Sequence, residues 1–181
     1  MGVVGYLSST FPDQNVGGCV VGQAAPPLNG PYVVTSGFGF REVRVAGTSP
    51  FHPAVDLVGQ CGDPIYATLP GRVSRSDALF LSITSPDGSV VSYLHSYVQD
   101  RVVEVGDMVT AGQLIARVGN VPPSSGCHLD IRVYIAGSSN GAVAALQTSP
   151  HRPGYAQPEE FFRLFGLELC DPQWCTRLAR G

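Results

Sequence analysis

The 181-residue sequence contains no lysine, since all eleven of its basic residues are arginine. Chemistry that needs a lysine amine to hold a substrate or a cofactor is therefore excluded. Charge of either sign is also sparse, because only 14% of the residues are charged and the formal net charge is −3. No basic field exists that would attract nucleic acid. We therefore expect no nucleic-acid partner.

Long apolar runs are missing as well. No stretch approaches the roughly 20 apolar residues of a membrane span, and residues 1–7 lack the charged and apolar regions of a signal peptide. The five cysteines include no C-x-x-C pair, which favours disulfides in an oxidising compartment over a structural zinc knuckle. We expect an extracellular or cell-wall location, reached by a fragment of a longer exported protein or by a phage-encoded lysin.

Glycine and proline are abundant, with 22 and 15 residues scattered without a period. Such frequent turn signals predict an all-β, mainly antiparallel fold with one short helix near the C-terminus. The length suits a single domain. We assign residues 1–30 to an N-terminal arm or linker, 31–166 to the domain and 167–181 to a C-terminal tail.

The clearest local signal is a hairpin with strands at 79–84 and 90–97, joined by a turn at 85–89. A further strand is predicted at 32–36. Residues 158–166 predict the helix, because Pro158 suits a first turn and Gly166 suits a C-terminal cap. The run 138–154 is predicted to be a loop.

One strand carries two groups that are costly to bury. In the segment 126–133, His128 and Asp130 are two residues apart and would share one face of the strand. A buried imidazole and carboxylate need a metal ion, a charge partner or a substrate to offset their desolvation. The strand is therefore either part of a site or part of a satisfied ion pair.

Six short motifs follow one another along the chain. They are S-G-F-G-x-R at 36–41, H-x-x-x-D at 52–56, G-x-P-I-x-A at 62–67, Y-x-H at 93–95, G-D-x-V-x-x-G-Q at 106–113 and G-x-H-x-D at 126–130. The ordered set resembles the lysostaphin-type (LytM-like) zinc endopeptidases of bacterial cell walls, over roughly residues 32–165. The resemblance implies an antiparallel β core with a groove over a zinc ion, in agreement with the composition.

The resemblance also implies roles for individual residues. His52 and Asp56 correspond to the first two zinc ligands. His95 and His128 correspond to two catalytic histidines that position or deprotonate water and stabilise the oxyanion. The third ligand in the family is the second histidine of H-x-H, and Asp130 occupies that position here.

Asp130 leaves two interpretations open. A carboxylate oxygen can bind zinc at about 2.0–2.2 Å, close to the distance for imidazole, but a second carboxylate weakens the pull of the ion on water and favours a harder metal such as Mn²⁺. Alternatively the site is degenerate and empty, with Asp130 paired to Arg132 or to a loop arginine. His151 is either a replacement ligand or a solvated loop residue.

Other residues are expected near this site. Arg41 and Tyr93 are placed at the substrate groove, although Arg41 also suits a simple surface charge. Cys61 and Cys127 lie beside the two ligand motifs, and we predict a disulfide between them, with two buried free thiols as the alternative. In the tail, Cys170 and Cys175 bracket a short loop that a second disulfide would close.

The sequence is consistent with two functions for this protein. The first is hydrolysis of a peptide bond in the stem peptide or cross-bridge of peptidoglycan by metal-activated water. The second is an inactive module of the same fold that binds cell-wall peptides, or that regulates or anchors a hydrolase. Biotinyl and lipoyl carrier domains, which share the pattern at 106–113, are excluded by the missing lysine, and no H-E-x-x-H helix occurs.

Overall fold

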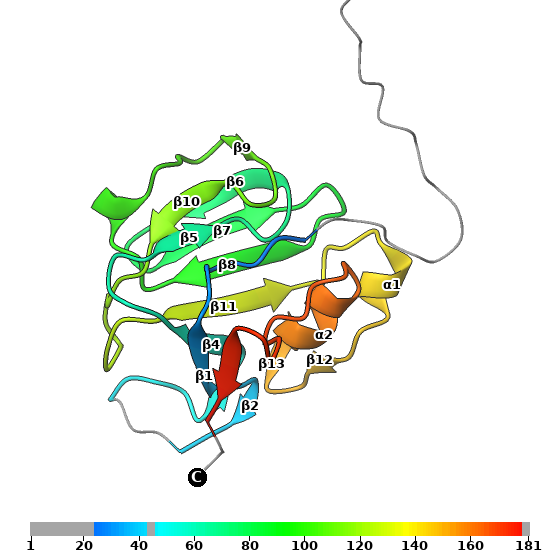
Figure 1. The fold of residues 1–181 in the computed structure, drawn as a ribbon. Coiled ribbons are helices and arrows are strands. Elements are labelled where there is room, and N and C mark those ends of the chain that lie inside the picture. The colour runs from blue at the N-terminus through cyan, green and yellow to red at the C-terminus, as the bar shows by residue number, and fades with distance from the viewer. Residues whose placement is uncertain (1–23, 43–45, 179–181) are drawn as a thin grey trace, which may run out of the picture.

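In the computed structural model, residues 24–42 and 46–178 are described. Residues 1–23 lie outside this range, so most of the predicted arm is not covered. The described chain forms short strands and two short helices (Figure 1). Their bounds are β1 Tyr32–Ser36, β2 Gly39–Phe40, β3 Phe51–His52, β4 Val55–Val58, β5 Pro64–Tyr66, β6 Gly71–Ser76, β7 Phe80–Thr84, β8 Val90–Leu94, β9 Met108–Val109, β10 Leu114–Arg117, β11 Leu129–Tyr134, α1 Gly141–Ala144, β12 Thr148–Ser149, β13 Arg152–Ala156, α2 Pro158–Arg163 and β14 Cys175–Arg177, with a 3-10 turn at Val98–Asp100.

The main sheet has the order β14-β1-β4-β11-β8-β7-β6-β9, and β13 joins it beside β11. Every strand pair among the described residues is antiparallel except β1 with β14. The mainly antiparallel fold and the β7–β8 hairpin are therefore confirmed. Both described helices are too short to cross a bilayer.

The two faces of the sheet differ in polarity because side chains alternate along each strand. On β11, Leu129, Ile131 and Val133 are fully buried in the apolar core, while Asp130 and Arg132 point to the opposite face. The small sheet of β5 and β10 covers the apolar side and contributes to the same core. The polar face is thus free to build a site.

The helix predicted at 158–166 is present as α2, with Pro158 in its first turn. The run 138–154, predicted to be a loop, instead contains α1, β12 and the first residues of β13, so that α1 is a second short helix beside the single one expected. The Asn140 side chain caps α1 by accepting from the backbone N–H of Ala142 and Val143. Figure 1 shows α1, α2, β12 and β13 gathered at one end of β11.

The segments beyond both predicted boundaries pack on the sheet. Leu28 is buried in the core. After α2, Leu167 and Leu169 are also core residues. The Cys170–Cys175 disulfide then precedes β14, which pairs in parallel with β1.

Candidate metal centre

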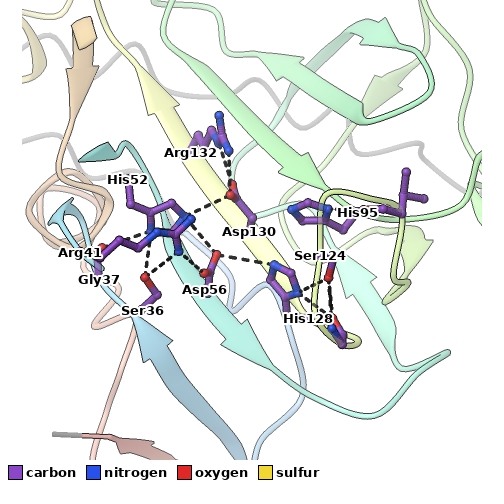
Figure 2. Close-up of polar contacts among 12 residues, drawn as sticks. Ser36, Gly37, Arg41, His52, Asp56, His95, Ser124, His128, Asp130 and Arg132 are labelled. Atoms are coloured by element: carbon purple, nitrogen blue, oxygen red, sulfur yellow. Dashed lines mark hydrogen bonds and ion pairs between the residues drawn. The ribbon is translucent and has the colours of Figure 1, made fainter. Parts of the chain in front are cut away.

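Strand register brings the two aspartates of the motifs together. In the antiparallel pair β4–β11, Asp56 and Asp130 lie directly opposite each other on the polar face. His52, on β3, points between them, and Figure 2 shows the three side chains converging. His52 Nε2 lies 3.2 Å from Asp56 Oδ1 and 3.2 Å from Asp130 Oδ2. All three residues are at least 93% buried, since their exposures are 1%, 7% and 2%.

The second nitrogen of His52 faces the backbone. Its Nδ1 lies 3.2 Å from the Gly37 carbonyl oxygen, which can only accept, so Nδ1 carries a proton. Burial alone would lower the pKa of His52, but hydrogen bonds to Asp130 and Asp56 outweigh it and raise the pKa to about 9. In the metal-free protein Nε2 is therefore protonated at neutral pH, and a metal ion would replace that proton.

Each carboxylate is also contacted by an arginine. Arg41 Nη1 donates to Asp56 Oδ2 at 3.0 Å and to Ser36 Oγ at 2.9 Å. Arg132 donates two hydrogen bonds to Asp130, from Nε to Oδ1 at 2.7 Å and from Nη2 to Oδ2 at 2.8 Å. Burial would raise the pKa of Asp130, but the Arg132 guanidinium holds it well below its usual range. Asp130 is therefore ionised.

The donor set fits a small divalent cation. One atom each from His52, Asp56 and Asp130 lie within 4.8 Å of one another. Tetrahedral zinc, with bonds of about 2.0–2.2 Å, needs its ligand atoms about 3.4 Å apart, and the two distances from His52 Nε2 are 3.2 Å. Asp56 Oδ1 is buried, and its polar contacts among the described residues are to two histidine nitrogens, His52 Nε2 at 3.2 Å and His128 Nε2 at 3.7 Å. A bound metal ion would satisfy this oxygen.

His95 and His128 lie next to this cluster, with ring centroids 4.5 Å apart. His95 Nδ1 is 2.6 Å from the Val121 carbonyl oxygen, and His128 Nδ1 is 2.8 Å from that of Gly126. These contacts place the proton of each neutral ring on Nδ1 and leave Nε2 as an acceptor. Burial lowers the pKa of His95, which keeps it neutral at neutral pH.

The backbone of His95 is strained. Its φ of +70° is the only positive value at a non-glycine residue in the described chain. Such a conformation costs on the order of 1–3 kcal/mol and is concentrated at functional sites. It occurs directly after β8 ends at Leu94, and it turns the His95 side chain to the polar face.

Tyr93 corrects one expectation. The residue is fully buried in the core, and its hydroxyl contacts the backbone N–H and the Oγ1 of Thr68, both at 2.7 Å. The prediction that Tyr93 lines the groove is therefore wrong. Tyr93 and His95 would share a face on a continuous strand, but the strand ends between them.

The remaining predicted residues lie as follows. Cys61 and Cys127 form the predicted disulfide, which links the loop after β4 to the residue before His128. His151 is not in the metal-ligand cluster, and its ring packs against Phe40 at a centroid distance of 4.6 Å. Cys19 lies outside the described residues.

A groove of about 590 Å³ contains the cluster and both catalytic candidates. Arg41 and Arg132 line it. Arg177 and Leu178 of the C-terminal segment also line it, although no motif in the sequence predicts them there. Their only signal in the sequence was a short tail behind a cysteine pair, which does not reveal that β14 pairs with β1.

The strands described above have the fold of lysostaphin. The catalytic domain of lysostaphin from Staphylococcus simulans superposes with a TM-score of 0.56 at 23% identity, over 71% of this chain and 90% of that domain. A zinc-containing peptidase from Vibrio cholerae superposes with a TM-score of 0.53 at 30% identity, over 62% of this chain and 37% of the other.

The sequence family agrees with the fold. Residues 50–142, slightly more than half of the chain, match Peptidase family M23. The chain belongs to this family. The peptidoglycan DD-endopeptidase ShyC of Vibrio cholerae is 30% identical over 110 residues, which are 58% of this chain and 25% of that protein. The chain thus spans about a quarter of the length of this relative.

Proposed function

We propose that this protein is a metal-dependent endopeptidase that hydrolyses a peptide bond of bacterial peptidoglycan, in the stem peptide or the cross-bridge. The observation that carries the proposal is the convergence of His52, Asp56 and Asp130, which each offer one buried ligand atom within 4.8 Å of the others. These three side chains would hold the metal. Zinc is the proposed ion, and Mn²⁺ is an alternative because two of the three ligands are carboxylates.

A bound zinc ion would supply Lewis-acid chemistry, polarising the scissile carbonyl and acidifying a water molecule. The protein's own groups would do the rest. His95 Nε2, neutral and hydrogen-bonded through Nδ1 to Val121, is suited to accept a proton from the attacking water and return it to the leaving amine. His128 donates from Nδ1 to the Gly126 carbonyl oxygen, and in its doubly protonated form Nε2–H would be the donor that holds the substrate carbonyl oxygen.

The peptidoglycan substrate is supported by the family and by the named activity of the Vibrio cholerae relative. Two disulfides among the described residues support action outside a reducing cytosol. We therefore propose that the chain works in the extracellular space or the cell wall, as part of an exported protein or as a phage lysin.

One observation favours a second function. Arg132 already occupies both oxygens of Asp130, and a carboxylate engaged in this way is a weaker ligand. If the metal does not bind, the groove would serve an inactive module that binds cell-wall peptide or regulates a hydrolase.

The test is release of free amines from purified peptidoglycan, after treatment with EDTA and after return of Zn²⁺ or Mn²⁺. We expect activity that EDTA abolishes and one of these ions restores. His128→Ala should lower the rate by about 10²-fold or more, the range for loss of a donor that stabilises the oxyanion. His151→Ala, a histidine outside the cluster, is the matched control. A wild-type protein that binds peptidoglycan but stays inactive with both ions would support the inactive module instead.

A further inference from the structure

The Asp130–Arg132 pair is built into the candidate metal centre. The two residues are two apart on β11 and therefore share the polar face. Arg132 holds Asp130 through two nearly parallel hydrogen bonds of 2.7 and 2.8 Å, a geometry that a planar guanidinium allows and an ammonium does not. The Arg132 side chain is only 21% exposed, so solvent screens its charge poorly.

The charges of the cluster balance. Asp56 and Asp130 carry two negative charges, and Arg41 and Arg132, which each contact one of them, carry two positive charges. Arg41 binds the outer oxygen of Asp56, while Oδ1 faces His52 Nε2 at 3.2 Å and His128 Nε2 at 3.7 Å. Arg132 takes the outer oxygen of Asp130 and shares Oδ2, which also faces His52. Once a metal ion has replaced the proton on His52 Nε2, these five side chains carry no net charge of their own.

We propose that Arg132 is a positioning residue that aims Asp130 Oδ2 at the metal position and cancels its charge, so that the Asp130–Arg132 pair acts as a net-neutral ligand. Two uncompensated carboxylates would attract a dication more strongly and would reduce its power as a Lewis acid. Arg132 keeps that power at the expense of affinity. The inference rests on the proposed metal-dependent function.

The alternative is that Arg132 simply stabilises β11 and has no effect on a metal. The two roles differ in sign. A structural residue, when removed, loosens the site and lowers metal affinity or leaves it unchanged. Removal of a charge-balancing residue raises the metal affinity. At a separation of about 6 Å, even the dielectric constant of water gives an interaction between a unit charge and a dication worth about tenfold in affinity.

The experiment measures Zn²⁺ affinity of the metal-stripped protein by competition with a chromophoric chelator, and records the absorption spectrum of the Co²⁺ form. Arg132→Gln removes the charge and keeps one donor, and Arg132→Met is a second neutral variant in case the first does not fold. Arg132→Lys keeps the charge. Arg75→Gln is the matched control, because Arg75 stacks on the same Phe80 ring as Arg132 but pairs with Asp77.

We expect the neutral variants to bind Zn²⁺ about tenfold more tightly or better. Arg132→Lys, which keeps the charge but loses the two parallel hydrogen bonds, should bind no more tightly than the wild type, and Arg75→Gln should be unchanged. A changed Co²⁺ spectrum in the neutral variants but not in the control would place the effect at the metal. Equal or weaker affinity in the neutral variants would overturn the inference. Metal binding by the neutral variants alone would support the charge effect while contradicting the proposed function. No binding by any variant would overturn both.

Discussion

The Cys61–Cys127 disulfide should contribute more to stability than the second disulfide, because it closes a far longer loop. The perturbation is the double substitution Cys61→Ser with Cys127→Ser, and the matched control is Cys170→Ser with Cys175→Ser. The paired cysteines are 66 residues apart in the first case and 5 in the second. The loss of loop-closure entropy in the unfolded chain then predicts a cost of about 4 kcal/mol for the first pair and about 2 kcal/mol for the second.

The assays are denaturant unfolding and thermal unfolding, both followed by circular dichroism, with EDTA present so that metal binding does not contribute. For a chain of this size we expect melting temperatures lower by about 10 °C and about 5 °C, respectively. Because Cys61 follows Asp56 by five residues and Cys127 precedes Asp130 by three, the first pair should also weaken zinc binding, whereas the second should not. Equal losses from the two pairs, or a larger loss from the Cys170–Cys175 pair, would refute the reasoning.

Two further predictions concern His52 and Tyr93. In the metal-free protein the pKa of His52 is raised from 6.5 to about 9, which corresponds to about 3 kcal/mol of stability that is complete below pH 6.5 and is lost as the pH rises through 9. Denaturant unfolding in EDTA at pH 6.5 and 9.5 should show this loss, and His52→Asn should remove it; a wild-type stability that stays level or rises over this interval would contradict it. Tyr93→Phe should cost about 1–3 kcal/mol, because it removes the hydrogen-bond partner of the buried Thr68 groups, while peptidoglycan hydrolysis by the folded protein continues. A variant with wild-type stability and lost activity would instead support the prediction that Tyr93 lines the groove.

The sequence predicted those features that depend on local pattern or on ordered motifs. The β7–β8 hairpin follows from a turn signal between two apolar runs, and α2 follows from Pro158 and Gly166. The convergence of His52, Asp56 and Asp130 was expected only through the resemblance of the motifs to a known family. The pairing of β4 with β11 that creates it is a long-range contact, which no local signal encodes.

The features that were missed depend on local exceptions or on distant pairing. Tyr93 and His95 have the spacing of one strand face, but the positive φ of His95 breaks the alternation, so that one residue faces the core and the other the groove. β13 was not predicted because it contains Pro153 and Gly154. These residue types are depleted in strands but are tolerated near the edge of a sheet. β14 was hidden because its partner, β1, lies at the other end of the chain.

Both alternatives for Asp130 had a basis in the sequence, and the structure contains the contacts of each. Asp130 faces His52 as a ligand would, and it pairs with Arg132 as a degenerate site would. Sequence alone does not rank these contacts, because the outcome depends on whether the metal or the proton on His52 occupies the space between the carboxylates.

The most direct test of the central claim is the zinc content of the purified protein, measured by elemental analysis for the wild type and for Asp130→Ala after equilibration with Zn²⁺ and removal of free ion. We predict one zinc ion per chain in the wild type and little or none in Asp130→Ala. Circular dichroism should show that both proteins are folded. A wild type without zinc, or an Asp130→Ala variant that retains one equivalent, would contradict the assignment of Asp130 as a ligand.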